Sequence, residues 1–200
     1  MNRTTPEAKK PFLKLKQFKN LLAGTGVVVV LGALSVGGAH HRLTLADRRV
    51  EAPWGQIRRL VQRQLDLTSE LASLLEGSFP GFKKPLRRLE KSRQQLFEQH
   101  RFLRTRAAQR QLHDYEKAQQ EMAADVERVL RVVSDIPSVT EDQRFLEWVG
   151  CYRATQKLLL KEKERYNSLA ARYNRSYETF FVHWVAERFK LQNRPIFRNG

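Results

Sequence analysis

The chain has 200 residues, which is enough for one ordinary domain with an appendage and too few for two full domains. Lysine and arginine outnumber aspartate and glutamate by 37 to 21, and the net charge of +16 favours anionic partners, whether lipid headgroups, nucleic acid or acidic proteins. The single cysteine, Cys151, excludes an intramolecular disulfide, and since no basic cluster beside it would activate a thiol, we expect a small packed side chain.

The N-terminal region combines a basic tail with an uncharged stretch. Residues 1–20 hold six basic residues and one acid, and residues 21–39 (LLAGTGVVVVLGALSVGGA) hold no charge. As a helix this stretch rises about 28 Å, close to the ~30 Å hydrocarbon core of a bilayer. We predict a transmembrane helix over residues 21–39. The alternative is a cleaved signal peptide, for which both the tail and the apolar run are long.

Basic residues near the two ends of the predicted span set its orientation. Six precede the span, and Arg42, Arg48, Arg49 and Arg58 follow it. This difference favours a cytoplasmic N-terminus, with the rest of the chain on the far side of the membrane.

Beyond residue 40 the apolar residues recur at helical spacing, and strand alternation is scarce. A first stripe ends at the GSFPG segment, residues 77–81, where glycine and proline stop a helix. Pro53 predicts that this helix either begins near Ala52 or bends there. The residues of the stripe are Val50, Trp54, Ile57, Val61, Thr68, Leu71 and Leu75.

Two further stripes share a segment, residues 86–136, that contains neither glycine nor proline. They comprise Leu86, Leu89, Leu96 and Leu103, and then Tyr115, Met122, Val126, Val129 and Val133. Since the stripes are offset by about 70° around a helix axis, we predict a break between Thr105 and Asp114. A turn follows at residues 135–142, where Ser138 or Thr140 is expected to cap the next helix.

The last long helix has an apolar position every seven residues, as in a left-handed helical bundle. The positions are Phe145, Tyr152, Leu159, Tyr166 and Tyr173. Asn167 and Asn174 each follow one of these tyrosines, about 100° around the helix, so we expect their amides to bond to another helix or to a tyrosine hydroxyl rather than to a ligand. Aromatic residues over 180–189 predict a short amphipathic helix that caps the bundle or rests on the membrane surface.

The chain has no recognisable catalytic motif. None of its five histidines has a glutamate three positions earlier, as a di-iron bundle requires, and there is no zinc spacing, phosphate-binding loop or nucleophile elbow. We therefore predict a protein that is not an enzyme and has no cofactor or metal. The alternatives are a metal-binding or enzymatic four-helix bundle, or a basic bundle that binds nucleic acid.

The most basic segment is residues 83–110, with ten basic residues and two acids. We expect it to be solvated or to meet anionic headgroups or an acidic protein. Nucleic acid is not an expected partner, because a domain on the far side of the membrane would rarely meet it. A second copy of the chain is a further candidate partner. The residues of this candidate anionic-partner face are Lys84, Arg87, Arg88, Lys91, Arg101 and Arg104.

Taken together, these segments resemble the LemA family of bacterial membrane-anchored helical proteins. The match runs over residues 50–197 and is most specific in the repeated Tyr-Asn pairs and the ETF sequence after them. Ser69 and Phe181 stand where the family has proline. The matching residues include Trp54, Asp66, Leu67, Pro137, Phe145, Tyr166, Asn167, Tyr173, Asn174 and Phe180.

The resemblance implies an all-α fold, with an N-terminal transmembrane helix followed by an antiparallel four-helix-type bundle and a short extra C-terminal helix. It implies a tether to the bacterial inner membrane and no assigned activity. Some relatives belong to the machinery of magnetosome membranes, which points to cell-envelope or intracellular-membrane organisation. We accordingly divide the chain into a basic tail (1–20), a transmembrane helix (21–39) and a LemA-like bundle (45–197).

Overall fold

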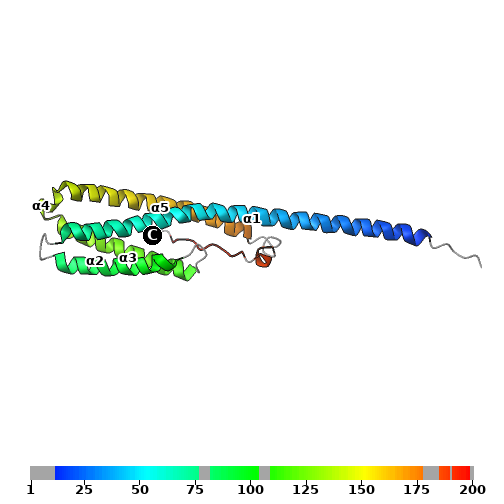
Figure 1. Ribbon diagram of the computed structural model, residues 1–200, viewed down its shortest axis with the longest axis horizontal. Helices are drawn as coiled ribbons and strands as arrows, with labels where there is room; N and C mark the ends of the chain where they lie inside the picture. The colour runs from blue at the N-terminus through cyan, green and yellow to red at the C-terminus, as the bar shows by residue number, and fades with distance from the viewer. Residues whose placement is uncertain (1–11, 77–81, 104–108, 178–184, 190, 199–200) are drawn as a thin grey trace, which may run out of the picture.

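The secondary structure of the protein is helical throughout most of its described part (Figure 1). The computed structural model describes residues 12–76, 82–103, 109–177, 185–189 and 191–198, and leaves the side chains of residues 12–31 and 33 undescribed. The helices are α1 (Phe12–Leu75), α2 (Lys83–Phe102), α3 (Gln109–Val133), α4 (Pro137–Thr140) and α5 (Gln143–Tyr177). The predicted all-α class and helical bundle are therefore confirmed.

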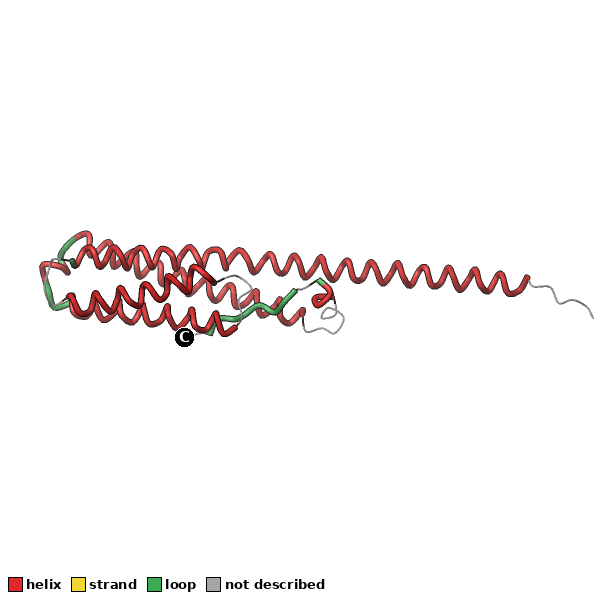
Figure 2. The backbone as a smooth tube through the Cα atoms, turned by 60° about the horizontal axis from the view of Figure 1, so that its bottom comes forward, coloured by secondary structure: helices red, strands yellow, loops and turns green. Residues whose placement is uncertain are grey.

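Helix α1 is much longer than the bundle and projects from one end of it (Figures 1 and 2). Its 64 residues span about 96 Å at a rise of 1.5 Å per residue. Among its described side chains the first buried one is Leu43, so we call residues 12–42 the stalk. In the described part of the chain, no helix has both the length and the apolar character that crossing a membrane requires. The predicted span, residues 21–39, lies in the stalk, and most of its side chains fall outside the described residues.

Pro53 does not begin or end a helix, contrary to the prediction of a start near Ala52. The proline lacks an N–H, so one carbonyl of the preceding turn has no helical donor. Both neighbouring turns are nevertheless fixed, because Val50 and Trp54 are buried against the bundle. This packing keeps α1 helical through the proline.

The core follows the predicted apolar stripes. Helix α1 packs along α5, and α2 packs along α3 (Figure 1). The seven residues of the first stripe and the five heptad positions of α5 are all buried, and among the other two stripes only Leu86 is partly exposed. Burial of each large apolar side chain contributes roughly 1.5–3 kcal/mol, so these stripes determine the helix pairing.

The helix ends differ in detail from the predictions. Helix α2 ends at Phe102 and α3 begins at Gln109, so the break starts before the predicted interval. Asp142, rather than Ser138 or Thr140, caps α5, because its Oδ1 accepts the backbone N–H of Arg144 at 2.8 Å. The Thr140 hydroxyl instead donates to the Ile136 carbonyl at 3.2 Å.

Cys151 is exposed, so the prediction of a packed side chain is wrong. The neighbouring residue Tyr152 faces the core, and one step along a helix turns a side chain by about 100°. The heptad register of α5 therefore directs the thiol outward.

The C-terminal segment is mostly extended where it is described. Residues 185–188 form one helical turn, and residues 191–198 have no regular secondary structure. The first half of the predicted amphipathic helix, including Phe180 and Phe181, lies outside the described residues. We call residues 191–198 the tail. It runs back along the bundle (Figures 1 and 2).

Candidate functional site

The two Tyr-Asn pairs hold the tail. The Asn174 side chain donates from Nδ2 to the Arg194 carbonyl at 2.8 Å and accepts the Arg194 backbone N–H on Oδ1 at 2.8 Å. Asn167 makes the same pair of bonds with Phe197, both at 2.9 Å. Each amide therefore bonds to both the backbone N–H and the backbone C=O of one tail residue, as a residue of a neighbouring β-strand would.

The seven-residue interval matches the geometry of an extended chain. Seven helical residues rise about 10.5 Å. Three extended residues span about 10 Å. Two amides seven residues apart on α5 therefore reach Arg194 and Phe197, which are three residues apart in the tail. The amides are structural, and their partner is the tail backbone rather than another helix or a tyrosine hydroxyl.

Helix α3 binds the same tail from the other side. Gln109 donates to the Ile196 carbonyl at 2.8 Å and accepts the Ile196 backbone N–H at 2.9 Å. Glu116 accepts the Arg198 backbone N–H at 3.2 Å, and Tyr166 of α5 donates to the Pro195 carbonyl at 3.0 Å. The tail thus bridges α3 and α5. Single glutamine and glutamate side chains carry no periodic signal, so the sequence did not reveal them.

The side chains of the tail bind α1. Arg194 is only 2% exposed, and its Nε and Nη2 donate to Asp47 Oδ1 at 2.9 and 2.6 Å. The same Nη2 donates to Glu51 Oε1 at 2.6 Å. The Phe197 ring lies 5.9 Å from the Trp54 ring, centre to centre. These pairs connect residues more than 140 positions apart and were not predicted.

The remaining family-motif residues also serve the fold. Leu67 supplies a backbone carbonyl to Trp148 Nε1 at 2.7 Å, and Asp66 is exposed and accepts a bond from Gln62 at 2.9 Å. Pro137 begins α4, and Phe145 and Tyr173 are buried.

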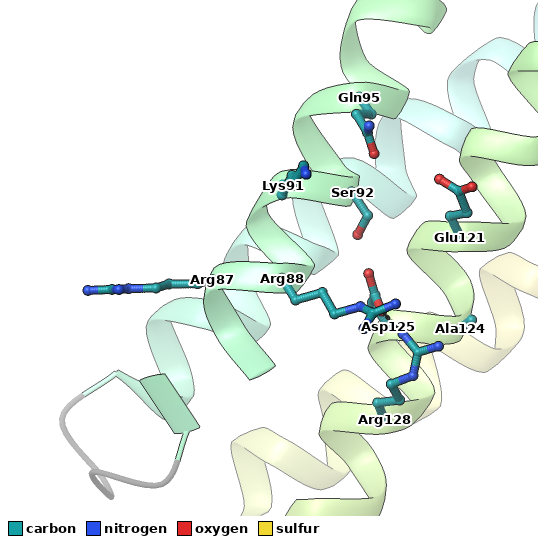
Figure 3. Close-up of a pocket in the computed structure, with 9 residues that line it drawn as sticks. All are labelled: Arg87, Arg88, Lys91, Ser92, Gln95, Glu121, Ala124, Asp125 and Arg128. Atoms are coloured by element: carbon teal, nitrogen blue, oxygen red, sulfur yellow. Dashed lines mark hydrogen bonds and ion pairs between the residues drawn. The ribbon is translucent and has the colours of Figure 1, made fainter. Parts of the chain in front are cut away.

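A different cluster forms a groove between α2 and α3, shown in Figure 3. One hollow of the groove has a volume of about 650 Å³ and adjoins a second of about 680 Å³. The two share Arg88, Asp125 and Arg128, and we call them together the basic groove. Its charged residues are Lys84, Arg87, Arg88, Lys91, Glu121, Asp125, Arg128, Arg131 and Asp135.

Asp125 organises the centre of the basic groove. It is 5% exposed, accepts a bond from Arg88 Nε at 2.9 Å and forms a second ion pair with Arg128 (Figure 3). One carboxylate therefore holds two guanidinium groups, each of which carries five N–H donors. The three side chains together retain a net positive charge and have donors left for a ligand.

The structure brings together four residues of the predicted anionic-partner face: Lys84, Arg87, Arg88 and Lys91 all line the basic groove. Arg101 lies near the opposite end of α2, with its guanidinium carbon 5.5 Å from the Phe102 ring centre, and Arg104 lies outside the described residues. Sequence reasoning missed Arg128 and Arg131 of α3, which complete the groove. The available signal was that Arg128 follows Asp125 by three residues and Arg131 follows Arg128 by three, as neighbours on one helix face do.

Burial shifts the pKa values of Lys163 and His100. Lys163 donates from Nζ to Gln119 Oε1 at 2.6 Å, and burial lowers the pKa of Lys163, opposed by the nearby Glu116 carboxylate. His100 lies with Nδ1 at 3.4 Å from the Tyr115 hydroxyl oxygen, and burial lowers its pKa, with a smaller contribution from Arg58. Within the described residues, no group of three histidine, cysteine or acidic side chains is arranged to hold a metal ion.

Comparison with known proteins identifies the family. The model of the LemA family matches residues 53–199, which include most of the bundle and the tail. The predicted family is thereby confirmed. No curated protein matches the chain.

Proposed function

This chain belongs to the LemA family, and we propose that it is a membrane-anchored helical interaction module rather than an enzyme. The observation that carries the proposal is the continuity of α1, which runs without a break from the uncharged residues 21–39 into the bundle core. An anchor in that segment would hold the bundle directly on a rigid helix, with no flexible linker. Its role would be to present a surface at a fixed place relative to a membrane, in cell-envelope or intracellular-membrane organisation.

The length of α1 places the basic groove far from the proposed anchor. Ser69 of α1 and Arg87 of α2 line the same hollow, so the groove lies at the level of Ser69. From Ala39 to Ser69 the helix rises about 45 Å, and a tilt of about 20° shortens this height only slightly. Exposed charges interact over about 8–10 Å at physiological salt. The headgroups of the anchoring membrane are therefore too far away, and the geometry favours a separate anionic partner.

We place the chain in the bacterial inner membrane with its N-terminus in the cytoplasm. The excess of basic residues before residues 21–39 supports this orientation. A reporter fused after Gly200 tests it, in one form active only in the cytoplasm and one active only outside. Activity outside is expected, and activity inside would overturn the orientation.

The anchor itself is tested by extraction of membranes at alkaline pH. The full chain should stay in the membrane pellet, because a spanning helix resists extraction whereas a peripheral protein is released. The variant Val27→Lys with Val30→Lys should be released, since each lysine at the centre of a span costs about 2.5–3.5 kcal/mol.

The matched control adds the same two lysines to the bundle instead, as Ala154→Lys with Leu158→Lys at exposed positions of α5. This control should stay in the pellet with the unmodified chain. Release of the unmodified chain would overturn the anchor.

A further inference from the structure

We propose that the basic groove between α2 and α3 is the docking site for a short, elongated acidic segment of a partner protein. This inference rests on the proposed function, because the acidic segment would be the anionic partner that the bundle binds. It is carried by the distribution of charge in the groove, by the apolar residues between the charges and by the acidic residues that limit its length.

The cations of the groove are spread out rather than gathered at one point. In Figure 3 Arg88 and Arg128 point toward Asp125, whereas the side chains of Arg87 and Lys91 point elsewhere. Lys84 and Lys91 are seven residues apart on α2, about 10.5 Å along the helix. A single phosphate is bound by donors that converge on it. A row of carboxylates, repeated along a peptide, fits this spread of charges better.

Several of these cations form no ion pair among the described residues. In the described part of the chain, Lys84, Arg87, Lys91 and Arg131 form no ion pair. The first turn of α2 also has no acidic residue, although the helix dipole places about half a positive charge there. An acidic ligand would supply negative charge both to these cations and to the first turn of α2.

The rest of the lining favours a polypeptide over nucleic acid. Pro85 and Val132 supply apolar surface, and Val132 is 42% exposed. No aromatic side chain among the described residues lines the groove, whereas single-stranded nucleic acid is commonly bound by stacking on aromatic rings. An acidic segment with apolar residues between its carboxylates matches both kinds of surface.

Acidic residues mark the two ends of the groove. Glu121 and Asp135 lie fourteen positions apart, at the start of the groove on α3 and just beyond the end of that helix, about 21 Å along its axis. On α3, Arg128 and Arg131 lie between these two acids. A long polyanion would have to pass over both carboxylates. A helical segment of about 14 residues, with its acids toward the middle, fits between them.

The test uses the full chain in an uncharged detergent and a fluorescein-labelled helical peptide of about 14 residues. Glutamate stands at every third or fourth position through the middle turns of the peptide, with leucine between. The groove variant is Arg87→Glu with Lys91→Glu. The control is Arg153→Glu with Lys157→Glu on the exposed face of α5, which changes the net charge equally. We expect the groove variant to weaken peptide binding about tenfold or more and the control to leave it within about twofold. Circular dichroism melting confirms that both variants fold.

Equal weakening in the two variants, or no binding of the peptide, would overturn the inference. Vesicles containing phosphatidylglycerol and a single-stranded oligonucleotide are tested in parallel. If either binds through Arg87 and Lys91 while the peptide does not, the acidic-segment inference fails but an anionic partner of the bundle stands. If none of the three binds, the anionic partner fails as well, and the membrane anchor is judged separately by alkaline extraction.

Discussion

At the level of single residues, the amides that bind the tail have a role that no isosteric acid can fill. A side-chain amide both donates and accepts, so Asn174 pairs with the N–H and the C=O of Arg194 together. A carboxylate only accepts, so aspartate at the same position would face the Arg194 carbonyl without a proton to donate.

We therefore expect Asn174→Asp to lower the free energy of unfolding by about 1–3 kcal/mol, the usual cost of leaving a buried group unsatisfied. Urea unfolding followed by circular dichroism measures the change. The control Gln120→Glu makes the same amide-to-acid exchange at an exposed position of α3 and should have little effect. An equal loss in both variants would show that added charge, rather than the lost donor, is responsible.

The ion pairs of Arg194 predict a larger effect. Replacing Arg194 with methionine breaks its ion pair with Asp47, which is 8% exposed, and breaking such a buried pair costs about 3–5 kcal/mol. The double variant Arg194→Met with Asp47→Leu removes the buried carboxylate as well and should recover part of the loss. Both are measured by urea unfolding at constant pH. If the double variant were the less stable one, the buried charge of Asp47 could not explain the cost.

His100 makes stability depend on pH. Burial lowers the pKa of the imidazole below the unfolded value near 6.5, so the unfolded chain binds a proton between the two values while the folded chain does not. As the pH falls through this window, the folded state loses stability. Urea midpoints measured from pH 7.5 to 5 should therefore fall more steeply for the unmodified protein than for His100→Gln. His113→Gln, which removes an exposed imidazole from α3, is the control, and identical slopes for His100→Gln and the unmodified chain would contradict the prediction.

At the level of the helices, local periodicity accounts for what the sequence predicted. The heptad stripe of α5 and the stripe of α1 repeat within single helices, and all their positions are buried. The register also explains the error at Cys151, whose exposure follows from the inward position of Tyr152. The predicted helix start near Ala52 was wrong, because the local preference of Pro53 is overridden by packing of the turns on either side.

The tail could not be predicted in the same way, because every partner that positions it is far away in sequence. Arg194 meets Asp47 across 147 positions, and Ile196 meets Gln109 across 87. Extended residues without alternation give no periodic signal, so no element was predicted over residues 191–198. For the same reason Arg128 and Arg131 were not assigned to the basic face, which was identified from one segment alone.

Because the tail bridges α3 and α5, its removal should loosen one end of the bundle more than the other. We expect truncation after Lys190 to reduce hydrogen-exchange protection most strongly at Gln109–Glu116 and around Tyr166, which bind the tail directly. The far end of α3, near Val129, should be affected less. Exchange followed by mass spectrometry of peptides measures both. Uniform loss of protection would mean that the tail stabilises the bundle only globally.

At the level of the whole molecule, α1 determines where every surface lies relative to the proposed anchor. Trp148 bonds to the Leu67 carbonyl, so Cys151, about one turn further along the antiparallel α5, lies near the level of Gln64. The rise from Ala39 to Gln64 is about 38 Å. Arg175, at the other end of α5, lies near the level of Asp47, because the adjacent Asn174 bonds to Arg194, which pairs with Asp47. Its height above Ala39 is about 12 Å.

The single exposed cysteine makes this geometry measurable. A donor dye on Cys151 of the chain in lipid nanodiscs should transfer little energy to acceptor dyes in the headgroups, since about 38 Å of helix separates them. A dye on Arg175→Cys, in a Cys151→Ser background, should transfer strongly from its lower position. A flexible glycine-serine insertion between residues 42 and 43 should raise the transfer from Cys151, because the bundle would then be free to approach the bilayer. Strong transfer from Cys151 without the insertion would mean that the bundle lies against the membrane, and the basic groove would then be within reach of the lipid headgroups.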